Sequence, residues 1–186
     1  MPDTDGTRVV HVKHVNAVHE GGLRFVLATG SGHAIVLDDG VSDTGARPTE
    51  AFLASLVACT AMDIVSLLTK KRQPYTRYSV ESEAHQQDEY PQVFTWIELV
   101  HVVEGAGLEE AAVRRCIELS ATRYCPINAM ISAGPTEVHH RYRIVEPAIA
   151  GAGGPAAAAV DGETRVREGE VMVTGPNGRI VAGSLV

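Results

Sequence analysis

Three cysteines are the residues of this 186-residue chain best suited to covalent chemistry, and two of them stand in unusual surroundings. Cys59 lies near the middle of PTEAFLASLVACTAMDIVSLLTKKR (48–72), which is apolar nearly all the way round. Cys125 precedes a proline in RYCPIN, where a helix must break. Backbone N–H groups freed there, together with nearby Arg123, would favour a thiolate. Cys116, in AVRRCIEL, is expected to be an ordinary core residue.

Metal and disulfide frameworks are not expected from this sequence. No two cysteines have the close C-x-x-C spacing of a zinc site, and three cysteines in a long intracellular chain do not make a disulfide scaffold. His11 and His14, and also His139 and His140, are close in sequence. On strands these spacings place the two rings of each pair on opposite faces. We therefore expect no metal and no cofactor, and any function of the cysteines must come from their pairing in space.

The overall charge excludes two classes of partner. A net charge of −7 and a pI near 5.6 argue against binding to nucleic acid or to an anionic membrane surface, since both need clustered cations. The one basic cluster, Lys70, Lys71 and Arg72, falls at a predicted helix C-terminus, where cations complement the helix dipole. We also expect no apolar run of the roughly 18 residues that span a membrane, and no signal peptide. The expected location is the cytoplasm.

The pattern of apolar and turn residues predicts an α+β domain with mostly antiparallel strands around a long buried helix. Strands are expected at 9–18, 23–30, 33–39, 75–85, 93–105 and 137–147, and helices at 48–71 and from 108 to about 123, with further helical turns after Pro126.

Composition divides the chain into three parts. Residues 1–147 are expected to form the domain, because the following segment, AIAGAGGPAAAAVDGE, is too poor in large side chains to pack a core. Residues 148–169 therefore read as a flexible linker. The C-terminal part, 170–186, contains PNG flanked by alternating apolar residues, which predicts a hairpin or a tail.

Two motifs together resemble the signature of the OsmC/Ohr family, the osmotically inducible and organic hydroperoxide resistance proteins. They are GARPTEAFLASLVACTAMDIVSLLTKKR, around Cys59, and RYCPINA, whose Cys125 follows 66 positions later. GLRFVLATGSGHAIVLDD, further upstream, resembles the opening strands of the OsmC-like branch, and the likeness covers roughly residues 8–146. It implies the OsmC-like fold, an intertwined homodimer whose sheets wrap long central helices, with two active sites at its interface.

The resemblance also implies a mechanism. Cys59 would be the peroxidatic thiolate that attacks a hydroperoxide and becomes a sulfenic acid. Cys125 would be the resolving thiol that condenses with it to a disulfide. An external dithiol, of the lipoyl type in the organic hydroperoxide branch, would then reduce the pair.

An arginine and a glutamate assist the thiolate in the family's peroxidases. Their glutamate stands ten residues before the first cysteine; here Thr49 occupies that position and Glu50 stands nine residues before Cys59. Nine helical residues rise about 13.5 Å and turn about 900°, which puts Glu50 on the opposite face of a straight helix. Glu50 would therefore act through a chain bend or from the partner subunit, or would only stabilise the helix dipole. Arg47 is the first choice for the arginine, with Arg24 as the alternative.

Two classes of function remain open on this reading. The first is a thiol-dependent peroxidase that reduces organic hydroperoxides and hydrogen peroxide, and the two cysteines favour it. The second is a non-peroxidase OsmC-like protein with a stress-response or small-ligand-binding role, and the altered position of Glu50 favours it.

Overall fold

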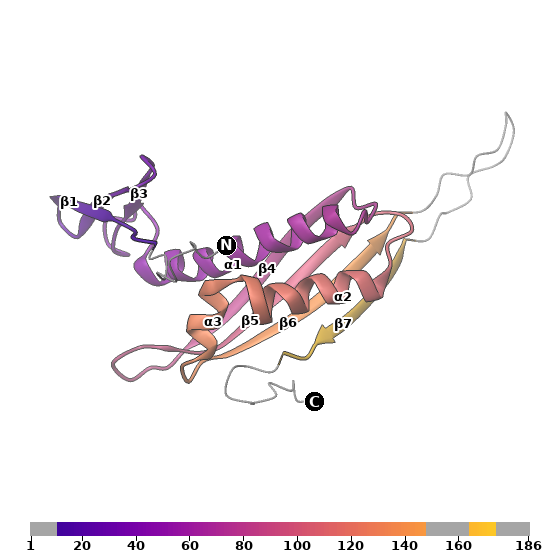
Figure 1. Ribbon diagram of the computed structural model, residues 1–186. Coiled ribbons are helices and arrows are strands. Elements are labelled where there is room, and N and C mark those ends of the chain that lie inside the picture. The colour runs from indigo at the N-terminus through magenta and orange to yellow at the C-terminus, as the bar shows by residue number, and fades with distance from the viewer. Residues whose placement is uncertain (1–10, 148–163, 174–186) are drawn as a thin grey trace, which may run out of the picture. The chain divides into compact units, whose positions relative to one another are not determined.

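The computed structural model describes residues 11–147 and 164–173, which cluster into two compact units, Met1–Phe52 and Leu53–Val186 (Figure 1). The sequence predicts a single domain over residues 1–147. The two units correspond to two sheets, since the described N-terminal strands form a sheet of their own. Each unit is described by itself below.

A three-stranded antiparallel meander makes up most of the N-terminal unit. Its strands are β1 (Val15–Gly21), β2 (Arg24–Thr29) and β3 (Ala34–Leu37), in the order β1-β2-β3. The turn between β1 and β2 uses Gly21 and Gly22 at φ of 111° and 57°, a region that favours glycine. The meander is as predicted, but β1 begins later than residue 9 and ends at Gly21, so His11 and His14 precede it.

Helix α1 (Pro48–Lys70) confirms the predicted central helix almost to the residue. Pro48 occupies its first turn, where a missing N–H costs nothing, and Lys70 complements the dipole at its end. Within this chain α1 buries one stripe with a spacing of four residues: Leu56, Thr60, Ile64 and Leu68. The remaining faces are also apolar, yet Met62 is 73% exposed.

By length and composition α1 is also apolar enough to cross a membrane, and only 22% of its most apolar window is buried. The expectation that no apolar run reaches this length is therefore wrong. A single helix of this kind is weak evidence for a membrane span, because core helices pass the same test.

The second unit is built on a mixed four-stranded sheet. Its strands are β4 (Arg77–Gln86), β5 (Phe94–Glu104), β6 (Glu137–Glu146) and β7 (Arg165–Val171), in that order. β4–β5 and β6–β7 are antiparallel, while β5–β6 is parallel. A parallel pair requires a crossover connection, and helices α2 (Glu110–Leu119), η1 (Ser120–Tyr124) and α3 (Pro126–Ser132) provide it.

Two apolar clusters lie between the helices and the sheet. One joins Ile64 and Leu68 of α1 to α2, β5, β6 and β7, with Ile117 and Ile144 fully buried. The other joins Leu56 of α1 to β5, α3 and β6. Figure 1 shows α2 and α3 lying along the sheet, and the second cluster contains the site described next.

Some predicted boundaries differ from the structure. The second predicted helix does not run unbroken to residue 123, because α2 gives way to the π-helical turn η1, closed by the bond from Cys125 N–H to Ser120 O at 2.9 Å. The predicted linker, 148–169, overlaps β7, whose strand pairs with β6. Residues 174–186 of the predicted C-terminal hairpin lie outside the described residues.

Candidate active site

Cys59 and Cys125 lie in direct contact. The Cys125 thiol donates to Cys59 Sγ with the two sulfurs 2.7 Å apart, and both residues are free thiols in this structure. The sulfurs are thus closer than ordinary non-bonded contact and further apart than the roughly 2.05 Å of a disulfide. The structure therefore brings together the two cysteines that the sequence paired, and an S–S bond needs only a small movement.

Local structure explains how each thiol reaches this position. Cys59 lies on the half-buried side of α1, one residue before the buried Thr60. Cys125 is the N-cap of α3, with an extended backbone at φ −76° and ψ 104°, and Pro126 follows it as the first helical residue. Its sulfur accepts a hydrogen bond from Asn128 N–H at 3.3 Å. The helix break predicted at Pro126 therefore aims the second thiol at the first.

The other cysteine is chemically separate. Cys116 is fully buried in the cluster formed with α2 and β6, as expected of a core residue. Burial raises the pKa of its thiol to about 11. Burial and the contact with Cys59 raise the pKa of the Cys125 thiol to about 12. Cys125 is thus a neutral thiol at physiological pH, as suits a group that reacts second rather than first.

A chain of buried polar side chains supports the Cys125 turn. Asn128 Nδ2 donates to Ala121 O at 2.8 Å, and its Oδ1 lies 3.2 Å from His140 Nε2. His140 Nδ1 lies 3.1 Å from His101 Nε2, and His101 Nδ1 lies 2.7 Å from the Tyr78 hydroxyl. Burial keeps both rings neutral by lowering their pKa values. Because the Asn128 oxygen can only accept, each Nε2 of the neutral rings then carries the proton. Sequence reasoning missed this chain.

The same two histidines predict a pH dependence of stability. Burial holds the pKa of His140 at about 4 and that of His101 well below its usual value. Below about pH 6.5 these two histidines therefore bind protons in the unfolded chain, whereas their buried rings stay unprotonated in the folded chain. Their contribution to the free energy of unfolding is fully present above pH 6.5 and falls, by about 1.4 kcal/mol per pH unit for each ring, as pH drops toward 4.

Urea unfolding of the reduced protein at pH 7.0, 6.0 and 5.0 measures that slope at constant protein concentration. His140→Gln should lower this slope by the contribution of one proton, about 1.4 kcal/mol per pH unit. His33→Gln, at an exposed position, should leave the slope unchanged. Equal slopes for the wild type and His140→Gln would contradict the buried neutral ring.

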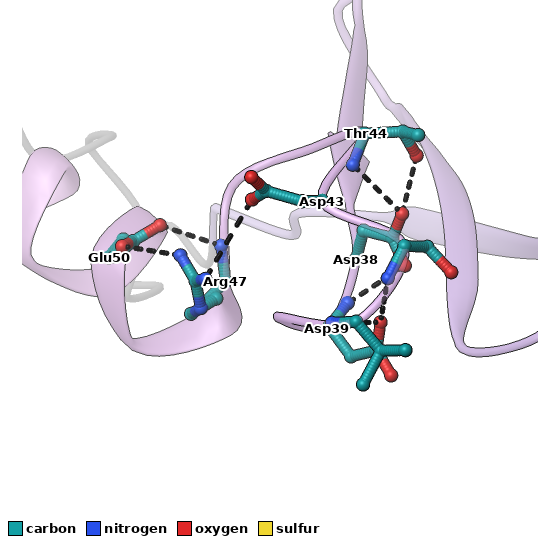
Figure 2. Close-up of polar contacts among 8 residues, drawn as sticks. Asp38, Asp39, Asp43, Thr44, Arg47 and Glu50 are labelled. Atoms are coloured by element: carbon teal, nitrogen blue, oxygen red, sulfur yellow. Dashed lines mark hydrogen bonds and ion pairs between the residues drawn. The ribbon is translucent and has the colours of Figure 1, made fainter.

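Arg47 and Glu50, the two other predicted site residues, form a pair of their own in the N-terminal unit. Figure 2 shows Glu50 receiving both the Arg47 backbone N–H, at 2.9 Å, and its guanidinium, at 3.1 Å. Asp43 lies on the other side, 3.7 Å from the same guanidinium. The Arg47 backbone N–H, followed by its charge, holds the pKa of Glu50 below its ordinary value. Glu50 therefore fixes Arg47, as a bidentate partner would.

Arg24, the alternative arginine, is tied to a different part of the same unit. Its guanidinium donates to Thr44 Oγ1 at 2.7 Å and to Thr44 O at 3.2 Å, and it also pairs with Glu20 at 3.1 Å. Thr44 in turn bonds Asp38 (Figure 2). These contacts give Arg24 a clear structural role in the loop before α1.

An apolar pocket of about 460 Å³ lies within the N-terminal unit, bounded by strand residues and by the loop that carries Arg47. Its walls include Leu23, Phe25, Leu27 and Leu37, and Arg47 is one of its few charged groups. Asp38 and Asp39 also line it. An apolar cavity with a few charged groups at one side of its lining suits a small apolar molecule that carries a polar end.

Asp63 is the residue near the thiols that sequence reasoning missed. A carboxylate oxygen of Asp63 and the sulfurs of Cys59 and Cys125 all lie within 4.8 Å of one another, and they are the residues that could hold a metal. Two thiolates on tetrahedral zinc stand about 3.7 Å apart, given Zn–S bonds of about 2.3 Å, so the 2.7 Å contact fits bond formation between the sulfurs better than chelation. The signal was present in the sequence, since Cys59 and Asp63 have the i, i+4 spacing of one helix face.

Comparison with known proteins identifies the family of this chain. The family model of OsmC-like proteins matches residues 40–140. The protein YhfA of Escherichia coli K12 is 36% identical over 124 residues, which cover 67% of this chain and 92% of YhfA.

Solved structures show the same fold. The OsmC-like protein of Mycoplasma pneumoniae superposes with a TM-score of 0.64 at 14% identity, over 73% of this chain and 99% of that one. The organic hydroperoxide resistance protein OhrB of Bacillus subtilis superposes with a TM-score of 0.50 at 17% identity, over 71% and 98%. The chain therefore belongs to the OsmC-like protein family.

Proposed function

We propose that this protein is a thiol-dependent peroxidase that reduces organic hydroperoxides through Cys59 and Cys125. The observation that carries the proposal is the 2.7 Å contact between the two thiols, one on an apolar helix and the other at a helix N-cap. The family includes proteins described as organic hydroperoxide resistance proteins, such as OhrB, which supports the substrate class.

The proposed cycle balances without a cofactor. The Cys59 thiolate attacks the terminal peroxide oxygen, the O–O bond breaks, and the leaving alkoxide takes a proton to become an alcohol. Cys59 is then a sulfenic acid, which Cys125 attacks to give a disulfide and water. An external dithiol such as dihydrolipoamide then reduces the disulfide and returns Cys59 and Cys125 to thiols. Such a cycle needs a reducing compartment, which makes the cytoplasm the proposed location.

A second candidate function is small-ligand binding without peroxide chemistry, and the apolar pocket beside Arg47 favours it. The two candidates differ in what happens to Cys59. A coupled assay with cumene hydroperoxide, hydrogen peroxide and dihydrolipoamide should show dithiol oxidation that depends on enzyme. Binding of an apolar ligand with no dithiol oxidation under any of these conditions would select the second function.

Arg47 is the proposed cation for the Cys59 thiolate, a role that requires the assembled protein to bring its guanidinium to the sulfur. Arg47→Ala should move the pH midpoint of Cys59 alkylation upward, because a thiolate in an apolar wall forms less readily without a nearby cation. The measurement uses a Cys125→Ser background, so that one reactive thiol is followed. Arg24→Ala is the matched control, since it removes an equal charge from the same unit. An upward shift in Arg24→Ala alone would transfer the role to Arg24.

The chain is also proposed to form a homodimer. Among the described residues, helix α1 is apolar on faces that stay exposed, with Met62 73% exposed, and a helix of that kind is normally covered. Sedimentation at low micromolar concentration should give about twice the chain mass of 19.8 kDa. Met62→Glu should weaken the association. A monomeric wild type at that concentration would contradict the proposal.

A further inference from the structure

Asp63 forms a compact triangle with the two thiols. It follows Cys59 by four residues on α1, one helical turn further along the same face. A carboxylate oxygen of Asp63 and both sulfurs lie within 4.8 Å of one another. That distance suits proton transfer through one bridging water or after a small side-chain movement.

A hydrogen bond from a buried serine orients the carboxylate. Ser120, which is fully buried in η1, donates from Oγ to Asp63 Oδ2 at 3.0 Å. A carboxylate has two oxygens, so this bond leaves acceptor capacity on the carboxylate for a proton. Cys125 is fixed as well, by the Asn128 N–H and by Cys59. Asp63 and Cys125 are thus held by separate contacts, and Cys59 lies against the Cys125 sulfur.

The second step of the proposed cycle requires such a group. Cys125 must lose its proton before its sulfur can bond to Cys59, and the oxygen leaving the sulfenic acid must gain one. Because burial and the contact with Cys59 raise the pKa of the Cys125 thiol, very little of it is thiolate at pH 7. A nearby base that takes the proton during the attack removes this limitation.

We propose that Asp63 is the acid–base residue of the thiol pair, an inference that rests on the proposed peroxidase function. As Cys125 Sγ bonds to Cys59 Sγ, the carboxylate accepts the Cys125 proton and passes it to the hydroxide that leaves Cys59. The S–S bond forms, the S–O bond breaks, and water is released. In the reductive half, the Asp63 carboxylate accepts the proton of the attacking external thiol and passes it to the cysteine sulfur that this thiol expels.

Single-turnover kinetics test this role, with sulfenic acid formation and its condensation to disulfide followed as separate phases. In Asp63→Asn the condensation should slow by about 10²-fold more than sulfenic acid formation does. The remaining condensation should accelerate about tenfold per pH unit between pH 6 and 8, because it then depends on the thiolate fraction of Cys125. Wild type should show a much flatter profile, and Asp63→Glu should recover most of the lost rate.

Ser120→Ala is the matched structural control, because it removes the bond between η1 and Asp63 but keeps the carboxylate. If Asp63 only ties the two helices together, both variants should slow condensation equally and keep the flat profile. That result, or an unaffected Asp63→Asn, would overturn the inference.

A peroxide-free reaction separates this inference from the proposed function. Glutathione disulfide converts Cys59 to a mixed disulfide, and Cys125 then displaces glutathione, whose leaving thiolate takes the proton. Quenched samples analysed by mass spectrometry give the rate of that displacement, in which Asp63→Asn should again be slow and steeply pH-dependent. If the wild-type protein does not reduce hydroperoxides, the proposed function is wrong. The displacement of glutathione by Cys125 still decides the role of Asp63 in that case.

Discussion

Replacing Cys59 with serine should lower hydroperoxide reduction by about 10³-fold or more. A hydroxyl group at this position does not ionise near pH 7 and so supplies no nucleophile for the peroxide oxygen. The assay is turnover of cumene hydroperoxide with dihydrolipoamide as reductant, followed through oxidation of the dithiol. The size of the effect comes from chemistry and not from packing, since serine is close in volume and Cys59 is only partly buried.

Cys116→Ser is the control for that experiment. It removes a thiol from the same protein, but from the core cluster between α2 and β6 and away from the reacting pair. It should retain turnover, at some cost in stability because the site is fully buried. Comparable losses in Cys59→Ser and Cys116→Ser would show that the assay reports on folding and not on the nucleophile.

Cys125→Ser should have the second largest effect, and of a different kind. The first oxidation should still occur, because Cys59 is intact, but the sulfenic acid has no internal thiol to condense with. Turnover with a dithiol reductant should fall by about 10-fold or more, and excess hydroperoxide should carry Cys59 on to the sulfinic acid. A sulfenic-acid-specific trap, read by intact mass, should label this variant more strongly than wild type.

The opposite pattern would remove Cys125 from the mechanism. If Cys125→Ser turns over as fast as wild type and accumulates no trapped sulfenic acid, an external thiol resolves Cys59 directly. The close approach of the two sulfurs would then reflect packing within the cluster of α1, β5 and α3.

Local sequence patterns predicted the elements that carry the thiols. The run from Pro48 to Lys70 has the length, the N-terminal proline and the C-terminal lysine of one helix, and that is what forms. The helix break at Pro126 could also be predicted from the sequence, because proline suits the first helical turn and leaves the preceding residue extended. The pairing of Cys59 with Cys125, by contrast, came from the family resemblance, since 66 residues separate them.

Long-range register explains what the sequence alone did not predict. The contact between His101 and His140 depends on β5 and β6 lying side by side in parallel, with Leu99 opposite His140. The sequence predicted the helices that separate these two strands, but neither their parallel pairing nor its register. His139 and His140 do face opposite ways, as predicted: the His139 ring lies 5.7 Å from the Trp96 ring in a tilted arrangement, while His140 joins the buried chain.

Asp63 is a different case, because its spacing from Cys59 was visible in the sequence. A carboxylate one turn from a cysteine becomes informative only when the second thiol and Ser120 are known to lie beside it. Arg47 and Glu50, around the start of α1, are a third case. The structure pairs Arg47 with Glu50, three residues apart, and their proposed role beside Cys59 stays a prediction.

Peptide mapping after one equivalent of cumene hydroperoxide tests directly whether the peroxide joins Cys59 to Cys125 in a disulfide. Fully reduced protein is oxidised, its remaining thiols are alkylated, and the digest is analysed by mass spectrometry without reduction. We expect a single linked peptide pair that joins Cys59 to Cys125, with Cys116 recovered as an alkylated thiol. A reduced Cys59, or a disulfide that includes Cys116 in place of Cys125, would contradict it.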